Sequence, residues 1–344
     1  MKAIYTKAPY QFELREVALR APRHNEALIR VEACGLCGSD LHTARDAVSF
    51  EPLGHEVAGV VEQVGEYVTN VRPGDRVVLE SGSYDRFSSL SRDGKYDLDN
   101  NGRHFFNTQQ DGNGMGFAEY LIAPDEVCVP YEGLSLAAAT MIEPLGVAFD
   151  LVKVSDIELG STVMVVGIGT IGLCALRLAK LRGAAKVIAV STRGRARRDA
   201  AARAYGADEI VYADEDFSAC RADRILCTAP PEAMPGLLKN LNVGGVLSYI
   251  GEGGSPYATF DMDYLHWHKL QIRASYAAPA LFFPVCIKLA RLKMIDLDLL
   301  HTHDLRLEHF KEDFDFYRQD RENAIKAVMF TAGREDAPAA KRAE

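Results

Sequence analysis

The chain has 344 residues, which is long for one domain and predicts two. Apolar residues make up 48% and charged residues 25%, values that exclude a disordered, collagen-like or low-complexity protein. There are 39 Lys and Arg residues against 48 Asp and Glu residues, so the net charge is −9. We therefore expect no nucleic-acid partner and no attraction to an anionic membrane surface.

The number of cysteines and the first residues of the chain indicate the cellular compartment of the protein. Seven cysteines are an odd number and too few for a disulfide framework, which indicates a reducing environment. The first residues contain no apolar run of the kind found in a secretory signal. The sequence contains no stretch of about 18 consecutive apolar residues, so we expect no membrane helix. We therefore expect a cytoplasmic protein.

The first section, from Met1 to about Gly146, predicts a β-rich barrel or sandwich. Short apolar runs alternate there with Gly and Pro turn signals, as is typical of strands joined by turns. The expected strands are Ala27–Glu32, His55–Val64, Arg76–Glu80, Ala118–Ile122 and Val127–Pro130.

The second section, from about Val147 to Tyr276, alternates strands with helices. This order predicts parallel βαβ units and a doubly wound sheet buried on both faces. The expected strands are Val163–Val166, Val187–Val190, Glu209–Tyr212, Arg224–Thr228, Val246–Ile250 and Gln271–Ala274, and the expected helices are Ile171–Leu181, Ala196–Tyr205 and Met234–Leu241. A third section combines a helix near Phe283–Leu292 with a last amphipathic stretch.

A glycine-rich motif, GIGTIG, lies between the first strand and the first helix of the second section. A dinucleotide-binding fingerprint needs this context. The glycines allow a tight turn and a close approach of pyrophosphate, and the helix N-terminus favours the anion. A merely structural turn is the alternative. We expect Gly167, Gly169, Thr170, Ile171 and Gly172 to bind a dinucleotide.

The end of the second strand in this section favours NADP over NAD. An NAD site usually carries Asp or Glu here, to bond the ribose 2′-hydroxyl. This chain has Ser191 and Thr192 followed by arginines, and hydroxyl and guanidinium groups suit a 2′-phosphate. Arg193 is the main candidate because it lies closest to the strand end, and Arg198 and Thr228 are further cofactor candidates. A solvated, arginine-rich helix face is the alternative.

A second motif, CGLCGSDLH, contains Cys37. The chain has no second Cys-x-x-Cys, which excludes a four-cysteine zinc site, and the β-rich context does not fit a redox pair. The remaining interpretation is that the motif supplies one thiolate ligand to a catalytic zinc. Such a site requires a His and a third ligand elsewhere in the chain. His55 and Glu56 supply a His and a carboxylate together, and Glu143 supplies another carboxylate.

Together these motifs resemble the zinc-dependent medium-chain dehydrogenase/reductase superfamily, nearest its polyol, sugar and threonine dehydrogenase branches. The matching segments are Cys37–His42, Gly54–Gly59, Val64–Gly65, Pro73–Val77, Phe117–Tyr120, Glu143–Leu145, Gly167–Gly172 and Arg321–Val328. They cover nearly the whole chain in order. The resemblance implies a GroES-like β-rich catalytic domain (residues 1–146 and 277–344) and an inserted Rossmann dinucleotide-binding domain (residues 147–276).

The resemblance also implies a metal site. Cys37 and His55 match ligands of a catalytic zinc. Glu56 and Glu143 match carboxylates that bind the metal directly or through water. The structural alternatives are a buried apolar thiol for Cys37, a core histidine for His55 and a carboxylate at a helix start for Glu143.

Ser39 and His42 have catalytic counterparts in the family. Ser39 matches the hydroxyl that hydrogen-bonds the substrate alcohol, and His42 matches the relay that carries its proton to solvent. A zinc ion acts as a Lewis acid that lowers the pKa of a bound alcohol, and an imidazole is suited to proton exchange near neutral pH. The alternative for His42 is a surface turn residue.

One departure from the family concerns a second zinc. Many members hold a structural zinc with four cysteines in a lobe that matches Ser81–Gly116 here. The four ligand positions fall on Asp85, Ser88, Ser91 and Asp99. Serine does not replace a thiolate as a zinc ligand at neutral pH. We therefore expect one zinc per subunit and a lobe held by hydrogen bonds and packing.

The leading interpretation is a zinc-dependent oxidoreductase that transfers hydride between a secondary alcohol (a polyol, sugar or related molecule) and NADP(H), with NAD(H) possible. The alternatives are an NAD-dependent threonine or amino-alcohol dehydrogenase, a zinc-free member of the quinone reductase type, and a non-catalytic dinucleotide-binding protein. The resemblance implies a homodimer or homotetramer, paired near Val246–Ile250 and Gln271–Ala274.

Overall fold

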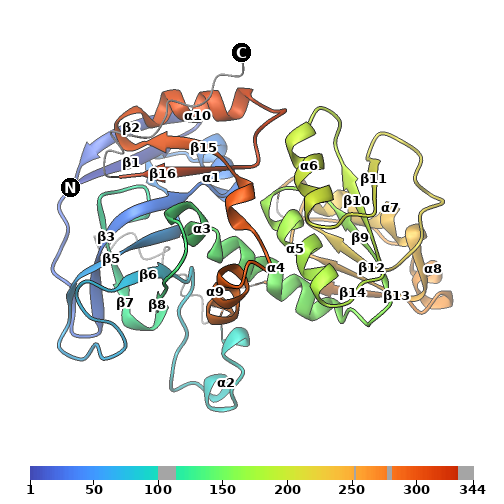
Figure 1. The fold of residues 1–344 in the computed structure, drawn as a ribbon, viewed down its shortest axis with the longest axis horizontal. Helices are drawn as coiled ribbons and strands as arrows, with labels where there is room; N and C mark the ends of the chain where they lie inside the picture. Colours follow the sequence, from blue (N-terminus) through green and yellow to red (C-terminus); the bar gives the residue numbers. More distant parts are fainter. Residues whose placement is uncertain (100–113, 252, 277–280, 332–344) are drawn as a thin grey trace.

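The computed structural model describes residues 1–99, 114–251, 253–276 and 281–331. Figure 1 shows a β-rich half and an α/β half side by side, with helix α4 (Ile142–Ser155) at their junction. The structure confirms the expected fold class, a β-rich domain combined with a doubly wound parallel sheet.

The β-rich half is built on a seven-stranded mixed sheet with the order β15-β16-β3-β5-β6-β8, and β7 also pairs with β3. The chain enters this sheet early and returns to it at the end, so its first and last segments lie in one domain. The strands are β3 (Glu26–Gly35), β5 (Glu56–Val64), β6 (Arg76–Leu79), β7 (Tyr120–Pro124), β8 (Cys128–Pro130), β15 (His301–Arg306) and β16 (Lys326–Phe330).

A three-stranded antiparallel sheet adjoins the first, with the order β2-β1-β4. Its strands are β1 (Lys2–Lys7), β2 (Gln11–Glu16) and β4 (Glu51–Pro52). Helix α10 (Phe310–Gln319) packs on this sheet: the ring centroids of Phe12 and Phe314 lie 4.6 Å apart. Helices α1 (Gly38–Asp46), α3 (Leu136–Thr140) and α9 (Phe283–Arg291) complete this half.

The α/β half is a six-stranded parallel sheet with the order β11-β10-β9-β12-β13-β14. Counted within this sheet, the order is 3-2-1-4-5-6, that of a dinucleotide-binding fold. The strands are β9 (Thr162–Val166), β10 (Lys186–Ser191), β11 (Glu209–Tyr212), β12 (Ala222–Cys227), β13 (Leu241–Tyr249) and β14 (Gln271–Ala274), and the helices are α5 (Thr170–Leu181), α6 (Ala196–Ala204), α7 (Met234–Leu237) and α8 (Met262–Trp267).

Strand β9 shows why the centre of this sheet is apolar. Its alternate residues point to opposite faces. Val163 and Val165 join the cluster formed with α4 and α5, whereas Met164 and Val166 join the cluster that contains Met234 of α7. Both faces are therefore buried, and the strand reads as an uninterrupted apolar run.

Two sequence expectations differ from the structure in detail. The helix expected over Met234–Leu241 ends at Leu237, a 3-10 turn follows, and β13 begins at Leu241. The Asn240 side chain donates to the carbonyls of Phe217 and Cys220, which anchors the end of that turn. The expected domain boundary at residues 146 and 147 falls within α4, and the expected last domain includes residues 277–280 and 332–344, which lie outside the described residues.

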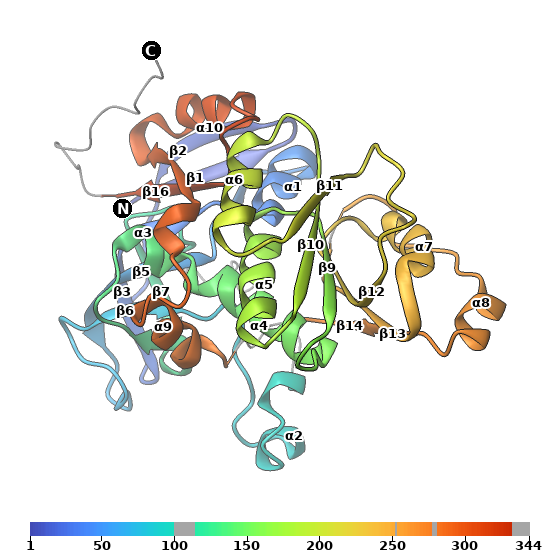
Figure 2. The ribbon, with the colours of Figure 1, turned by 45° about the vertical axis from the view of Figure 1, so that its right-hand side comes forward.

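The lobe that begins at Ser81 projects from the body at α2 (Ser89–Arg92), as Figures 1 and 2 show. Asp99 is almost fully buried in it and accepts hydrogen bonds from the hydroxyls of Ser88 and Ser91, the latter at 2.8 Å. Asp85 instead caps the backbone N–H of Phe87 and stays exposed. Ser88, Ser91 and Asp99 are thus joined by hydrogen bonds, whereas residues 100–113 of the expected lobe lie outside the described residues. The absence of a structural zinc stays a prediction.

Helices long and apolar enough to cross a membrane are not found among the described residues.

Candidate functional site

A cavity of about 870 Å³ lies between the two halves and is lined by residues of both. The residues that the sequence analysis selects line this one cavity, with a single exception, Arg193. They are Cys37, Ser39, His42, His55, Glu56, Glu143, Gly167, Gly169, Thr170, Ile171, Gly172, Ser191, Thr192, Arg198 and Thr228. Residues that are far apart in the chain therefore line the same cavity.

The cavity contains one group of potential metal ligands. Cys37, His55 and Glu56 each offer one ligand atom, and these atoms all lie within 4.8 Å of one another. A thiolate, an imidazole and a carboxylate form a donor set suited to zinc, and the adjoining cavity leaves room for a substrate oxygen. These residues therefore fit the metal that the family implies.

Asp40 organises the turn that carries Cys37. Cys37 is the N-cap of α1, and its backbone N–H donates to Oδ2 of Asp40 at 2.9 Å. The other carboxylate oxygen accepts from the backbone N–H of Gly54 at 3.3 Å and lies 3.7 Å from Nδ1 of His55. One buried carboxylate thus ties the Cys37 turn to the segment that carries His55.

Nearby groups set the charge state of His55 in the metal-free protein. Burial lowers the pKa of His55, but Cys37 and Asp40 outweigh this effect and raise it well above its ordinary value. An imidazole must be neutral to bind a metal, so metal binding at this site releases a proton.

Glu143 approaches the group from the first turn of α4. It is nearly fully buried, and burial raises its pKa to about 7 although His55 acts in the opposite direction. Ser81 donates a hydrogen bond to its carboxylate. Glu143 is not among the three residues whose ligand atoms cluster within 4.8 Å, so it faces the metal pocket from farther away.

Ser39 and His42 lie on α1, beyond Cys37 along the cavity wall. His42 reaches the other half of the molecule. A Cβ added at Gly253 would lie 2.8 Å from Cε1 of His42, so the imidazole packs directly against the loop after β13. Both side chains are half-buried, which suits groups that exchange a proton between a pocket and solvent.

The glycine-rich turn has the geometry of a dinucleotide cradle. Gly167 has φ +85, and a Cβ at Gly172 would lie 1.9 Å from the carbonyl oxygen of Gly167, so both positions require glycine. Thr228 donates from Oγ1 to the same carbonyl at 2.7 Å and fixes the turn. A Cβ at Gly169 would meet nothing within 4 Å, so the backbone there borders open space at the N-terminus of α5.

The arginines after β10 point in two directions. Arg193 is turned outward, where it forms ion pairs with Asp214 and Glu215 and stacks over Tyr212. Its guanidinium is therefore already engaged outside the cavity. The structure thus does not bring the leading cofactor candidate of the sequence analysis to the site.

Arg195 and Arg198 line the cavity instead. Arg195 donates to the carbonyl of Arg321 and Arg198 to that of Ala324, each at 2.9 Å. Within the described ranges neither forms an ion pair with a carboxylate, and burial lowers the pKa of both. Crowded, incompletely neutralised guanidinium groups beside Ser191 and Thr192 suit an anion.

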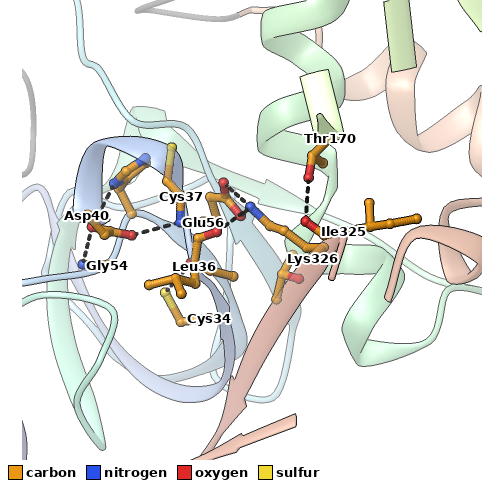
Figure 3. A network of polar contacts seen from close by, with 12 residues as sticks. Cys34, Leu36, Cys37, Asp40, Gly54, Glu56, Thr170, Ile325 and Lys326 are labelled. Carbon is orange, nitrogen blue, oxygen red and sulfur yellow. Dashed lines mark hydrogen bonds and ion pairs between the residues drawn. The ribbon is translucent and has the colours of Figure 1, made fainter. Parts of the chain in front are cut away.

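Sequence reasoning assigned no role to Asp40 and Lys326, and it named Arg195 only as one of the arginines after the strand. Asp40 had a usable signal, because an Asp three residues after an N-cap forms a capping box. Lys326 lies in the matching segment Arg321–Val328, but nothing in the sequence pairs it with Glu56, which is 270 residues away. Its Nζ lies 2.5 Å from the Glu56 carboxylate and donates to the carbonyl of Leu36 at 2.8 Å (Figure 3).

Two family models match the chain. One, described as an alcohol dehydrogenase GroES-like domain, matches residues 23–133. The other, described as a zinc-binding dehydrogenase, matches residues 170–281. The first match covers the part of the β-rich half that contains Cys37 and His55, and the second begins at the glycine-rich turn.

Curated relatives extend the similarity over most of the chain. Sorbitol dehydrogenase of Gallus gallus is 30% identical over 314 residues, 86% of each chain. Sorbitol dehydrogenase of Pongo abelii is 28% identical over 341 residues, 92% of each chain. D-xylulose reductase of Saccharomyces cerevisiae is 35% identical over 218 residues, 61% of this chain and 60% of that one.

Among solved structures, an alcohol dehydrogenase from Thermus sp. ATN1 superimposes with a TM-score of 0.86 at 25% identity. The alignment covers 96% of this chain and all of the other.

Proposed function

This chain belongs to the zinc-dependent medium-chain dehydrogenase/reductase family, and we propose that it transfers hydride between a secondary alcohol of the polyol or sugar class and NADP(H). Membership of the family makes it an oxidoreductase of the alcohol dehydrogenase type. We propose a polyol as the substrate class because the relatives include a sorbitol dehydrogenase and a D-xylulose reductase. One observation carries the proposal: a single cavity joins the Cys37, His55 and Glu56 group to the glycine-rich turn.

Zinc is the metal that the donor set suits. Cys37, His55 and Glu56 would hold it, with Glu143 as a nearby carboxylate. A bound zinc supplies Lewis acidity, which polarises a carbon–oxygen bond and lowers the pKa of a hydroxyl group. Asp40 orients the Cys37 turn and lies against His55, as outer-shell partners of metal ligands do.

The remaining chemistry belongs to the protein side chains. Ser39 hydrogen-bonds the substrate hydroxyl and accepts its proton, and His42 passes that proton toward solvent along α1. The turn at Gly167–Gly172 would hold the cofactor pyrophosphate at the N-terminus of α5, and the bound cofactor would supply the hydride chemistry. Arg195 and Arg198 hold the 2′-phosphate of NADP.

Metal analysis of protein purified without chelator tests this proposal. We expect about one zinc per subunit and turnover of polyols with NADP. Cys37→Ala should lose both zinc and activity. Cys34→Ala is the matched control, since Cys34 is a buried thiol on β3 that packs against Gly54 and Gly116. A wild-type protein that stays metal-free after zinc is supplied would favour the zinc-free quinone reductase alternative.

A homodimer or homotetramer is the assembly that we propose. Strand β14 ends the order of the parallel sheet, so its outer edge has no strand neighbour among the described residues. Trp267 on the adjacent helix α8 is 75% exposed. An edge strand beside a large exposed apolar side chain is suited to pairing with a second copy.

A further inference from the structure

We propose that Arg321 of the β-rich half completes the site for the 2′-phosphate of NADP, so that guanidinium groups from both halves of the molecule hold this one group. This role rests on the proposed use of NADP and falls to a residue for which the sequence analysis names no function. Arg321 lies in the turn between α10 and β16. Arg195 and Arg198 belong to the other half, at the N-cap and in the first turn of α6.

The backbone of this turn is fixed against α6. Arg195 donates from Nη1 to the carbonyl of Arg321, and Arg198 donates from Nε to the carbonyl of Ala324, each at 2.9 Å. The backbone N–H of Arg197 donates to a carbonyl of the same turn at 3.1 Å. The chain that follows α10 therefore lies alongside the start of α6, as Figure 1 shows. Arg321 is thus placed beside Arg195 although the two residues are 126 positions apart.

The three guanidinium groups are close enough to repel one another. Burial, and after it the charges of Arg198 and Arg321, lower the pKa of Arg195. Burial also lowers the pKa of Arg198, and the charge of Arg321 acts in the same direction. In the part of the chain that the structure describes, none of the three forms an ion pair with a carboxylate. A bound anion would relieve this repulsion.

Two nearby carboxylates are engaged elsewhere. Asp199, on α6, accepts hydrogen bonds from the hydroxyls of Ser191 and Tyr212. Asp320, which precedes Arg321, accepts a hydrogen bond from the side-chain amide of Asn323 at 2.8 Å. The positive charge of the arginines therefore remains for a ligand.

The arginines also retain hydrogen-bond donors where the ligand would lie. A guanidinium has five N–H donors, and Arg195 and Arg198 each direct one to a backbone carbonyl. Both line the cavity together with Ser191 and Thr192, at the strand end where the adenosine ribose binds in this fold. The side chain of Arg321 is exposed beside them. A phosphate monoester has three acceptor oxygens and a charge of about −1.5 to −2 at pH 7, which suits several guanidinium partners.

The consequence is a difference between the two cofactors. The 2′-phosphate of NADP would join the two halves through Arg321. NAD has no such phosphate, so it would leave the turn after α10 held by its hydrogen bonds to α6 alone.

The experiment measures the binding of two cofactor fragments that differ only in the 2′-phosphate, adenosine 2′,5′-bisphosphate and 5′-AMP. Isothermal titration calorimetry gives both Kd values for the zinc-loaded wild type and for Arg321→Ala, Arg321→Lys and Arg318→Ala. Arg318→Ala is the matched control, because Arg318 lies in the last turn of α10 but stacks on Tyr10, 3.7 Å from its ring centroid. Hydrogen exchange of residues 320–326 is followed with each fragment.

We expect Arg321→Ala to weaken binding of the bisphosphate by about tenfold and to change binding of 5′-AMP by less than about twofold. A tenfold loss is at the lower end for a charge-assisted hydrogen bond, as suits an exposed arginine. Arg321→Lys should recover part of the affinity, because it keeps the charge but not the planar fork. Arg318→Ala should bind both fragments like the wild type. The bisphosphate should slow exchange of residues 320–326 more than 5′-AMP does, and this difference should shrink in Arg321→Ala.

Other outcomes would overturn this assignment. If the wild type prefers the bisphosphate and Arg321→Ala keeps the same ratio of Kd values, Arg321 does not bind the phosphate, and the proposed function stands without it. Equal weakening in Arg321→Ala and Arg318→Ala would mean that the general positive charge of this surface, rather than a contact from Arg321, attracts the phosphate. A wild-type protein that binds the two fragments equally would contradict the use of NADP in the proposed function itself.

Discussion

Ser191 donates a hydrogen bond from Oγ to Oδ1 of Asp199 at 2.5 Å. Tyr212 donates to the other carboxylate oxygen at 3.1 Å. The hydroxyl proton of Ser191 is therefore committed to a carboxylate at the end of β10, where the adenosine ribose of a dinucleotide binds in this fold. This contact opposes the arginines of α6 in the choice of cofactor.

Asp199→Asn should raise the preference for NADP over NAD. The substitution removes a negative charge near the expected 2′-phosphate and keeps the shape of the side chain. We expect the ratio of kcat/KM values for the two cofactors to shift by roughly tenfold, which corresponds to about 1.4 kcal/mol of relieved repulsion. Steady-state kinetics with both cofactors measure this ratio. A shift toward NAD would show that Asp199 assists phosphate binding through Ser191.

Arg198→Ala should lower kcat/KM with NADP much more than with NAD. A charge-assisted hydrogen bond contributes about 1.5–3 kcal/mol, so the loss with NADP should be roughly 10- to 100-fold. Arg193→Ala is the matched comparison, because Arg193 pairs with Asp214 and Glu215 outside the cavity and should change the ratio less. The reverse ranking would restore Arg193 as the main cofactor residue.

Glu80→Gln should stabilise the protein increasingly as the pH rises. Glu80 is 3% exposed, and burial raises its pKa from 4.5 to about 8. Between these values the folded protein keeps a proton that the unfolded chain has released, so the free energy of unfolding falls as the pH rises through this window. Each tenfold change in a proton equilibrium corresponds to about 1.4 kcal/mol.

Denaturant unfolding at pH 5, 6, 7 and 8 measures the effect of Glu80→Gln. The gain over wild type should be small at pH 5 and largest at pH 8. Glu66→Gln, at an exposed position, controls for the loss of a negative charge. A difference that does not depend on pH would mean that Glu80 is ionised in the folded protein throughout this range.

Asp99→Ala should destabilise the lobe around α2. Ser88 and Ser91 would lose their common acceptor in a buried position, at a cost of about 1–3 kcal/mol. Asp97→Ala is the matched control in the same lobe, because the Asp97–Lys153 ion pair is partly exposed and contributes at most about 1 kcal/mol. Hydrogen exchange of residues 88–99 should rise in Asp99→Ala only. Equal exchange in the two variants would place the stability of the lobe elsewhere.

Trp267→Asp should shift the protein toward monomers if α8 and the edge of β14 form the subunit contact. Light scattering during size-exclusion chromatography measures the mass in solution. Met294→Asp is the comparison, since Met294 is a partly exposed apolar residue that follows α9, away from this sheet edge. A dimer that survives Trp267→Asp and dissociates in Met294→Asp would place the interface elsewhere.

In the α/β half, most of the fold could be predicted from the sequence. Strands such as Glu209–Tyr212 and Gln271–Ala274 were predicted with the bounds that the structure has. Neither strand is fully buried, and their local signal is the alternation of short strand-like runs with helical stretches. Helix α1 was missed because its apolar pattern is weak; Cys37 and Asp40 define its start through a cap.

The site was predicted less evenly than the fold. Cys37, His55 and the glycine-rich turn have short motifs whose chemistry is local, and they do line one cavity. Arg193 was chosen for its closeness to the strand end, but side-chain direction depends on Asp214 and Glu215, which follow β11. Distance along the chain does not determine which arginine faces the cofactor.

By itself the sequence determined the two-part fold, the dinucleotide turn and the donor types of the metal site. Each of these depends on residues within a few positions of one another, where spacing fixes geometry. Only the tertiary structure decided which charges meet. Lys326 reaches Glu56 from 270 residues away, and Asp199 rather than an arginine contacts Ser191. Such pairings depend on how strands and helices pack, because electrostatic energy depends on distance in space and on burial.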